Sequence, residues 1–419
     1  MSFSAPTAEQ AFVLRHVAGV DALADTEQFP DFSADMVDAI IEGAAALAAG
    51  SFAPLARTGD TVGARWQDGV VTMPDGYRAA YEAFAGNGWA GLTGAREAGG
   101  QALPFCLGAA AMENFGTVNV GFMLVATLTL GAIEVIALHG DAAQKRRWLP
   151  NLVSGKWTGT MNLTEPQAGT DLGALRTTAT PVSGGAYKIR GQKIFITYGE
   201  HDLTETIVHL VLARTPGAPP GSKGVSLFIV PKHRLDGSGA PTIPNGVKCV
   251  SIERKLGIHV SPTCVMSYGD EEDCIGELLG PEMGGLKAMF TMINNARIGV
   301  GNQGVQVAER AMQQAMAYAR ERIQSPRADG SSAGRSVAIA GHPDVRRMLL
   351  RMKALTQGAR ALLYYAAGQA DRAHLGDAAA KARLDLVTPL VKSYGSNVAC
   401  EVASIGVQVH GGTRYVEET

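Results

Sequence analysis

Two changes of sequence pattern, near Trp157 and near Gly284, divide the chain of 419 residues into three parts. The first part is helical in pattern, as in the Ala-, Ile- and Leu-rich segment from Asp35 to Gly50. The second has short segments rich in Thr, Val and Ile between clusters of Gly, Pro and Ser, which is typical of an antiparallel β-domain. In the third, apolar residues from Ile293 to Ala315 recur at intervals of three, four or seven, which indicates an amphipathic helix.

These patterns predict an α+β fold with a helical domain at residues 1–156, a β-domain at 157–282 and a helical bundle at 283–419. Helices are expected at residues 35–50, 101–115, 119–138, 142–149, 342–373 and 378–409. Strands are expected at residues 157–161, 175–180, 186–190, 194–197, 207–213, 225–230, 248–253 and 264–268. The segment from Ser325 to Ala340, which contains Gly330-Ser331-Ser332, is expected to be a loop.

Charge and composition exclude several classes of protein. The formal net charge is −2, which gives no indication of a nucleic-acid partner or of an anionic membrane surface. No uninterrupted apolar run reaches the length of a membrane span, and residues 1–10 lack a basic segment followed by an apolar one. The five cysteines form no CxxC pair, which favours reduced thiols and a cytoplasmic location.

The segment Met161–Asp171, MNLTEPQAGTD, follows the first expected strand. Pro166 and Gly169 end that strand and force a turn. The turn carries the hydroxyls of Thr164 and Thr170, and its successive N–H groups can surround an anionic or carbonyl-rich ligand. A Pro/Gly turn without a ligand is the alternative that this segment leaves open.

A second segment, Gly191–Gly199 (GQKIFITYG), changes the interpretation of the first. Together the two resemble the paired flavin-contacting segments of the acyl-CoA dehydrogenase family. That family has an N-terminal helical domain, a middle β-barrel and a C-terminal four-helix bundle, in the order predicted above. The resemblance extends from about Tyr77 to the last residue, and it implies a bound FAD cofactor.

In the first segment, the resemblance implies that backbone N–H groups near Leu163 and Thr164, which follow Met161, contact the pyrimidine edge of FAD. Preorganised donors there stabilise the negative charge that two-electron reduction builds up. Thr170, after Gly169, corresponds to the family's Ser or Thr beside the pyrophosphate and the acyl-CoA. The alternative for each threonine is a local hydrogen bond within the turn.

In the second segment, Phe195 stands where the family often has a Trp stacked near the isoalloxazine. Thr197, next to Ile196, stands where a hydroxyl or N–H contacts N5, the redox-active nitrogen of the flavin. The alternative is an ordinary strand with Phe195 in the core.

The late part of the chain carries further likenesses. Arg322, with Gln324, resembles the arginine that reaches the FAD pyrophosphate of a neighbouring subunit. Gln408, Gly411 and Gly412 resemble a QxxGG segment that holds the adenosine end of FAD across a subunit boundary, where the glycines allow close backbone approach. The resemblance therefore implies a homo-oligomer, either a dimer or a tetramer.

Substrate contacts are implied on the helix that contains Asn294 and Arg297. Arg297 matches a family arginine near the CoA thioester, and Asn294 lies on the same segment. An arginine with its stem along an apolar surface is the alternative. Ala296 stands where some members carry their catalytic Glu, which excludes that arrangement.

The residues from Phe195 to Thr204 and from Lys255 to His259 resemble a long bacterial branch of the family. The expected reaction is FAD-dependent α,β-dehydrogenation of an acyl-CoA to the trans-2-enoyl-CoA, with electron-transfer flavoprotein as the electron acceptor. The expected substrate is 3-methylmercaptopropionyl-CoA or a short- or medium-chain acyl-CoA. An acyl-CoA oxidase, another flavin enzyme on the same scaffold, and a non-catalytic flavin-binding scaffold are the alternatives.

The residue that acts as the catalytic base is not identified within the sequence. This branch places its catalytic Glu in a segment downstream of QxxGG, whereas here QxxGG is followed by residues 413–419. By spacing, Glu417 and Glu418 match residues in the turn before the last bundle helix and not the base. The general base is therefore expected beyond Thr419, and the helical bundle is expected to be incomplete.

Overall fold

The computed structural model describes residues 3–24 and 26–416, so Glu417 and Glu418 lie outside the described residues. The chain forms two compact units, each built from separate stretches of sequence. We call Met1–Ala53, Pro104–Val120 and Arg297–Thr419 the helical unit, and Pro54–Leu103 and Gly121–Ala296 the β-unit.

The β-unit holds the sheet and five α-helical segments. Its helices are α3 (Ala56–Thr61), α4 (Tyr77–Gly86), α6 (Ala142–Val153) and residues 121–139 of α5, and residues 285–296 begin α7. Its strands are β1 (Arg65–Gln67), β2 (Val70–Thr72), β3 (Trp157–Asn162), β4 (Thr178–Pro181), β5 (Ala186–Thr197), β6 (Thr206–Ala213), β7 (Ser226–Pro231), β8 (His233–Arg234), β9 (Ile243–Pro244), β10 (Val247–Ile252), β11 (Thr263–Tyr268) and β12 (Ile275–Leu278).

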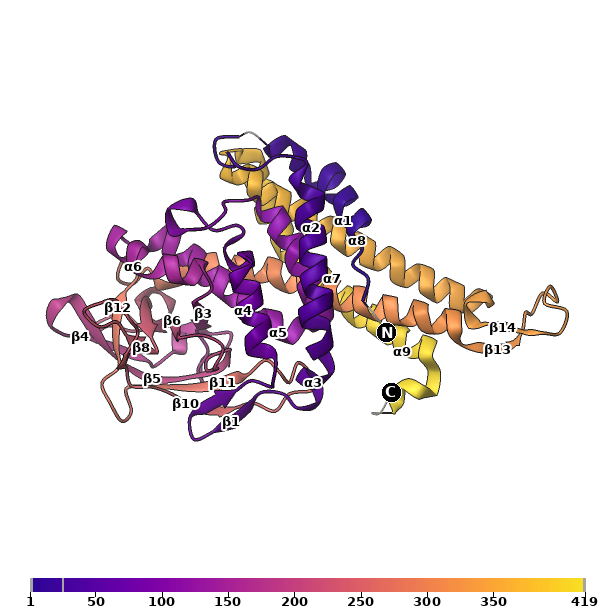
Figure 1. Ribbon diagram of the computed structural model, residues 1–419. Coiled ribbons are helices and arrows are strands. Elements are labelled where there is room, and N and C mark those ends of the chain that lie inside the picture. The colour runs from indigo at the N-terminus through magenta and orange to yellow at the C-terminus, as the bar shows by residue number, and fades with distance from the viewer. Residues whose placement is uncertain (1–2, 25, 417–419) are drawn as a thin grey trace. The chain divides into compact units, whose positions relative to one another are not determined.

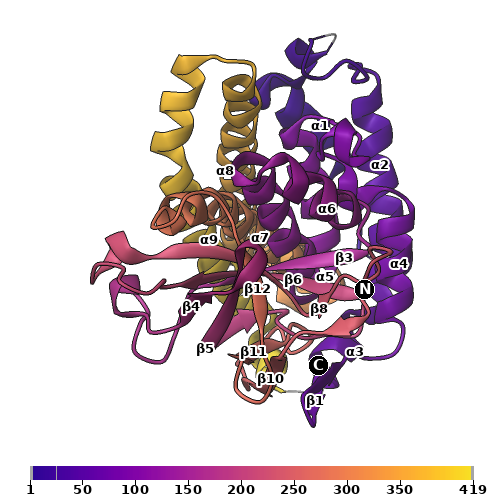
Figure 2. The ribbon, with the colours of Figure 1, turned by 90° about the vertical axis from the view of Figure 1, so that its left-hand side faces the viewer.

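The expected β-domain is confirmed as a curled sheet of eight strands (Figures 1 and 2). Its order is β10-β11-β5-β12-β7-β6-β3, with β4 paired to β5. One pair departs from the antiparallel expectation, because β3 and β6 run parallel. The segments 186–190 and 194–197, expected as separate strands, form the single strand β5, and β12 was not expected at all.

The sheet is buried on both faces at its strands β6 and β7. Val208, Leu210 and Leu212 of β6 join a core with α5, α6 and the start of α7, whereas Val211 and Ala213 face a second core inside the curl. Successive side chains of a strand point to opposite faces, so a strand covered on both sides is apolar throughout. This explains why β6 has no alternation of polar and apolar residues.

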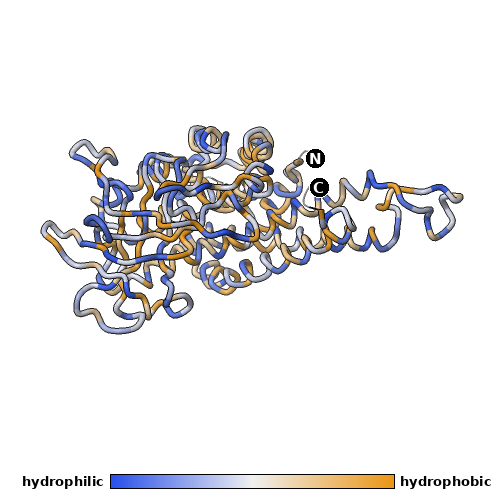
Figure 3. The backbone as a smooth tube through the Cα atoms, turned by 90° about the horizontal axis from the view of Figure 1, so that it is seen from below, coloured by the Kyte–Doolittle hydropathy of each residue, from blue (hydrophilic) through white to orange (hydrophobic). Residues whose placement is uncertain are grey.

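The helical unit contains α1 (Thr7–Val13), α2 (Met36–Leu47), α8 (Pro343–His374) and α9 (Ala378–His410). It also contains residues 105–120 of α5 (Phe105–His139) and residues 297–321 of α7 (Gly285–Glu321). Hydrophilic and hydrophobic residues are interspersed along α7 and α8, the two long helices that extend furthest to the right (Figure 3). Between α7 and α9 the backbones approach closely, since a Cβ on Gly304 would lie 2.2 Å from the carbonyl oxygen of Gly395.

The structure differs from the expectation at the middle of α5 and at the connection between α7 and α8. The helices expected at 101–115 and 119–138 form one element, α5, which is interrupted at Asn119 by non-helical backbone angles (φ −154°, ψ 72°). The segment from Ser325 to Ala340, expected to be a loop, instead forms most of a β-hairpin. Its strands are β13 (Ile323–Pro326) and β14 (Ser336–Ala338), and it extends beyond the ends of α7 and α8 (Figure 1).

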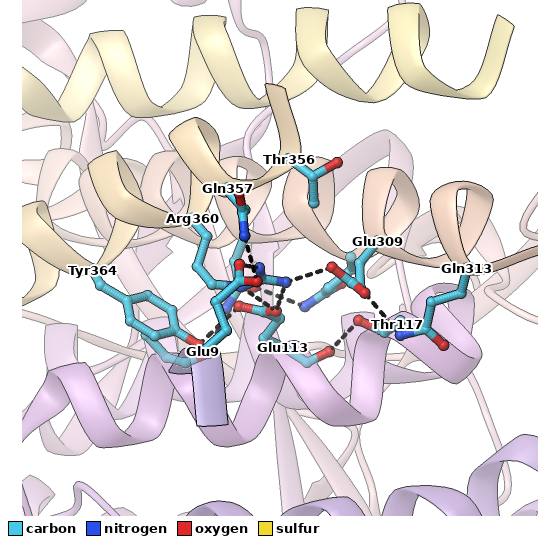
Figure 4. A network of polar contacts seen from close by, with 12 residues as sticks. Glu9, Glu113, Thr117, Glu309, Gln313, Thr356, Gln357, Arg360 and Tyr364 are labelled. Atoms are coloured by element: carbon cyan, nitrogen blue, oxygen red, sulfur yellow. Dashed lines mark hydrogen bonds and ion pairs between the residues drawn. The ribbon is translucent and has the colours of Figure 1, made fainter. Parts of the chain in front are cut away.

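A buried ionic cluster lies at the centre of the helical unit (Figure 4). Arg360 of α8 binds Glu113 of α5 and Glu309 of α7, each at 2.7 Å, and it also binds Glu9 of α1. The hydroxyl of Tyr364 donates to Glu113 (2.8 Å). One guanidinium therefore connects α8 with α1, α5 and α7.

Among the residues that the structure describes, two helical stretches are long and apolar enough to cross a membrane, which the sequence analysis did not expect. They are Met36–Thr61, with 22% of its most apolar window buried, and Phe105–His139, with 61% buried. A buried core helix can be as long and as apolar, and α5 supplies Val135 and Ile136 to the core of the β-unit.

Candidate active site

Two segments of the β-unit that are distant in sequence meet: the turn after β3, residues 163–168, and the second half of β5. The N–H of Ile194 donates to the carbonyl oxygen of Thr164 (2.9 Å). Nζ of Lys193 donates to the carbonyl oxygen of Leu163 (3.0 Å). The structure therefore brings together the two segments that the sequence resemblance pairs.

A buried ion pair fixes this turn. Nζ of Lys193 lies 2.8 Å from Oε1 of Glu165, and their side chains are 0% and 3% exposed. The Glu165 carboxylate also accepts from the N–H of Arg176 (2.6 Å) and from the N–H and hydroxyl of Thr177 (3.1 and 2.6 Å). Glu165 and Ala168 exchange two backbone hydrogen bonds of 3.0 Å, which close the turn on itself.

Both members of this pair are charged near neutral pH. Burial raises the pKa of Glu165, but the charge of Lys193 and the hydrogen bonds to the carboxylate outweigh it and bring the pKa to about 2. Burial lowers the pKa of Lys193 to about 8, and Glu165 limits that fall. The pair remains an ammonium and a carboxylate at pH 7.

The other expected residues of the first segment border this turn. Met161, Leu163 and Thr164 are half-buried, and Gly169 and Thr170 are exposed. In the part of the chain that the structure describes, neither threonine hydroxyl has a hydrogen-bond partner within the protein. The alternative of local turn hydrogen bonds is therefore not what the structure shows.

Phe195 has an unusual backbone conformation and an exposed ring. Its φ is +60°, and its side chain is 58% exposed. The register between β5 and β11 shifts at this point, between the pairs Cys264↔Ile196 and Met266↔Lys193. A positive φ in a bulky residue is strained, and such strain is concentrated at functional sites. The bulge turns the ring outward, which excludes the alternative of a core position and leaves an aromatic face free to stack on a ligand.

The two residues after Phe195 return to the sheet. Ile196 is buried in the inner core, so only its backbone can contact a ligand. Thr197 is half-buried and pairs with Thr263 of β11. Tyr198, also with a positive φ, donates its hydroxyl to the carbonyl oxygen of Gly121 (3.0 Å). Thr197 therefore lies between the bulge at Phe195 and the buried side chain of Tyr198.

The remaining expected contacts lie elsewhere on the chain. Asn294 is exposed on α7 in the β-unit, and Arg297 is half-buried in the helical unit. The five residues expected to reach a neighbouring subunit's FAD are all exposed in the helical unit: Arg322, Gln324, Gln408, Gly411 and Gly412. Gln408 lines an open groove of about 520 Å³ together with Arg347, Arg351 and Tyr415. Its lining also includes Glu401, which pairs with Arg351, and the apolar residues Met348, Ile405 and Val407.

Glu165 and Lys193 had no role in the sequence-based interpretation, although both lie in the segments on which it relied. A lysine at a position of β5 whose side chain faces the core needs a buried partner, and this was the available signal. Its partner could not be identified from spacing, because Glu165 precedes it by 28 residues in a turn.

Comparison with known protein families agrees with this geometry. The models of the N-terminal, middle and C-terminal domains of acyl-CoA dehydrogenases match residues 37–156, 160–270 and 283–419. The solved butyryl-CoA dehydrogenase of Megasphaera elsdenii is similar in fold, with a TM-score of 0.75 and 25% identity over 93% of this chain and 91% of that one.

Curated relatives are similar over almost the whole chain. The 3-methylmercaptopropionyl-CoA dehydrogenase of Ruegeria pomeroyi is 47% identical over 100% of this chain and 71% of its own length. A butyryl-CoA dehydrogenase of Syntrophomonas wolfei is 34% identical over 97% of this chain and 69% of its own length. The chain therefore belongs to the acyl-CoA dehydrogenase family. It is an oxidoreductase of the flavoprotein type, with FAD as its cofactor and an acyl-CoA as its substrate.

Proposed function

We propose that this protein dehydrogenates 3-methylmercaptopropionyl-CoA, or another short- or medium-chain acyl-CoA, to the trans-2-enoyl-CoA. The observation that carries the proposal is the junction of the two flavin segments through Lys193, Glu165 and Ile194. The choice of substrate is supported by the 47% identity with the Ruegeria pomeroyi enzyme over the whole chain.

FAD supplies the two-electron acceptor for this reaction. The turn offers backbone N–H groups near Leu163 and Thr164 to the pyrimidine edge, and Phe195 offers an aromatic face. Thr197 offers its hydroxyl or N–H to flavin N5. Thr170, Asn294 and Arg297 are proposed to contact the acyl-CoA, whose α-proton becomes acidic when donors polarise the thioester carbonyl.

The proposal includes an assembly. Arg322, Gln324, Gln408, Gly411 and Gly412 would complete the FAD site of a second copy, since all five are exposed. We therefore propose a dimer or tetramer, with domain boundaries near residues 156 and 282, which lie between the segments matched by the three family models.

Electron-transfer flavoprotein is the proposed oxidant of the reduced enzyme. A solved structure from work on the electron transferring flavoprotein of Acidaminococcus fermentans is similar to this chain, with a TM-score of 0.74 and 29% identity over 91% of this chain and 88% of that one. A cytoplasmic location is proposed from the five cysteines, all of which are free thiols.

The test is anaerobic titration of the FAD-loaded protein with a panel of acyl-CoA thioesters that includes the methylthio compound. Loss of the flavin absorbance band with formation of the enoyl-CoA is the expected result. Oxygen consumption by the substrate-reduced protein would instead indicate an oxidase. A protein that binds FAD but is reduced by none of the thioesters would indicate a non-catalytic scaffold.

A further inference from the structure

Lys193 occupies a position where a charged side chain is costly. Its ammonium is fully buried, and replacing a buried ion pair by apolar residues of similar volume is often neutral or stabilising. Stability alone is therefore a poor explanation for a buried ion pair between Lys193 and Glu165. What distinguishes Lys193 is its second contact, the hydrogen bond to the carbonyl oxygen of Leu163 (3.0 Å).

That contact determines the direction of a neighbouring N–H. The peptide unit that joins Leu163 to Thr164 is planar and trans, so its C=O and N–H point in opposite directions. Because the C=O is bonded to Lys193, the N–H of Thr164 points away from the ammonium. The next peptide unit is fixed as well, since its C=O accepts from Ile194 (2.9 Å) and its N–H, on Glu165, donates to Ala168 (3.0 Å). Rotation of the first unit is thus restrained on both sides.

The contact also changes the strength of that N–H as a donor. A cation on a carbonyl oxygen polarises the peptide unit, and hydrogen bonds in a chain strengthen one another at low dielectric. Reduction of a flavin builds negative charge on its N1–C2=O edge, so a stronger donor there favours the reduced state over the oxidised state.

We propose that Lys193 is a positioning residue that acts through the Leu163 carbonyl to direct and strengthen hydrogen-bond donation from Thr164 N–H to the pyrimidine edge of FAD. This inference rests on the proposed function, which places that edge beside the turn. Glu165 has the supporting role: its carboxylate keeps the buried amine protonated, and its backbone N–H and C=O close the turn through Ala168.

The test compares FAD-loaded variants by flavin midpoint potential and by the infrared band of the flavin C2=O. The double substitution Lys193→Gln/Glu165→Gln removes both charges while both side chains remain polar. The ratio of affinities for reduced over oxidised flavin is expected to fall about tenfold, a shift of about 30 mV to more negative potential. The C2=O band is expected to move to higher frequency. Lys232→Met is the matched control, because it removes the lysine of another ion pair with a buried carboxylate, Glu200, in the same unit.

A double variant that retains FAD with unchanged potential and band position would overturn the inference. Loss of FAD by a variant that keeps the circular dichroism of the parent would support it, since the turn would then no longer present its donor.

A second measurement uses the unsubstituted protein, so that the inference stays testable if the variants unfold. The C2=O band is followed between about pH 7 and about pH 10, across the pKa of Lys193, which burial lowers to about 8. The groups that face Lys193 are Glu165 from the turn, ionised throughout this range, and Met266 of β11, which does not titrate. An upward shift of the band with rising pH is expected, and a flat profile overturns the inference. Absence of FAD from the unsubstituted protein would contradict the proposed function instead.

Discussion

The guanidinium of Arg360 lies 2.7 Å from the carboxylate of Glu113, and neither side chain is exposed to solvent. The two residues belong to different helices, α8 and α5, and Nε of Arg360 donates to the same oxygen at 2.9 Å. Glu309 lies 2.7 Å from the same guanidinium, with a side chain that is 3% exposed. Two carboxylates deep in the helical unit thus depend on one cation.

Replacing Arg360 by Met is expected to destabilise the protein by about 3–5 kcal/mol, because Glu113 and Glu309 would remain buried without a counter-charge. The midpoint of urea unfolding measures this loss. Arg351→Met on the same helix is the control: its ion pair with Glu401 is exposed on both sides (57% and 39%), and its removal should cost less than about 1 kcal/mol. Equal shifts for the two variants would contradict the account of the cluster.

Stability is expected to fall as the pH drops below about 6.5, because two buried histidines stay neutral in the folded state. Burial, and then Lys232, lowers the pKa of His201 and His209 to about 3. Their rings bond hydroxyls of β3: His201 bonds Thr158 (2.9 Å) and His209 bonds Thr160 (2.7 Å). In the unfolded chain both histidines become protonated near pH 6.5, whereas in the folded chain they stay neutral. The loss of stability therefore continues down to about pH 3.

Each histidine should contribute about 2 kcal/mol of this loss between pH 6.5 and pH 5. Urea unfolding at several pH values should therefore show that the free energy of unfolding depends less on pH in His209→Gln than in the parent. His259→Gln is the contrasting control. Hydrogen bonds to the carbonyls of Asp60 and Lys255 raise the pKa of His259, so its removal should not flatten the profile. A His209→Gln profile parallel to that of the parent would refute the assignment.

Phe195→Ala is expected to weaken FAD binding by about 5- to 100-fold, as the loss of about 1–3 kcal/mol of stacking predicts. Phe195→Trp should retain the affinity, since a larger aromatic face would occupy the same exposed position. Titration of the apoprotein with FAD, followed by flavin fluorescence, measures both. Phe12→Ala, which removes a ring that is 60% exposed on α1, serves as the control. If Phe195→Ala binds FAD with unchanged affinity, the Phe195 ring does not contact the flavin.

Arg322→Ala should release FAD on dilution of the protein, with an affinity about 10- to 100-fold lower, because a charge-assisted hydrogen bond contributes about 1.5–3 kcal/mol. Arg320→Ala is the matched control, since Arg320 is also exposed and lies two residues earlier at the end of α7. Retained FAD is measured after gel filtration at several protein concentrations. Identical retention by the two variants would contradict the role of Arg322.

The long helices and most strands could be predicted because their signals are local. The start of α8 follows from Pro343, and that of α9 from the capping carboxylate of Asp377, which accepts from the N–H groups of Ala379 and Ala380. The break in α5 at Asn119 coincides with the predicted boundary between two helices. In each case a neighbouring residue, and not a distant contact, decides the structure.

Features that depend on distant partners could not be predicted. Strand β5 was interpreted as two strands because Gly191 interrupts its pattern, yet the glycine is needed there: a Cβ would lie 2.4 Å from the hydroxyl of Thr177. The bulge at Phe195 depends on the register with β11. The parallel pairing of β3 with β6 likewise depends on how the sheet curls and not on either strand alone.

The ionic cluster around Arg360 has a consequence for biosynthesis. Glu113 precedes Arg360 by 247 residues and Glu9 precedes it by 351. At about 5–20 residues per second, a ribosome would need on the order of ten to fifty seconds to proceed from Glu113 to its counter-ion. Throughout that interval the nascent chain carries the apolar α5 with an acidic residue that has no cation to bind. The helical unit can therefore complete its core only late in translation, and until then the apolar α5 lacks the helices that bury it.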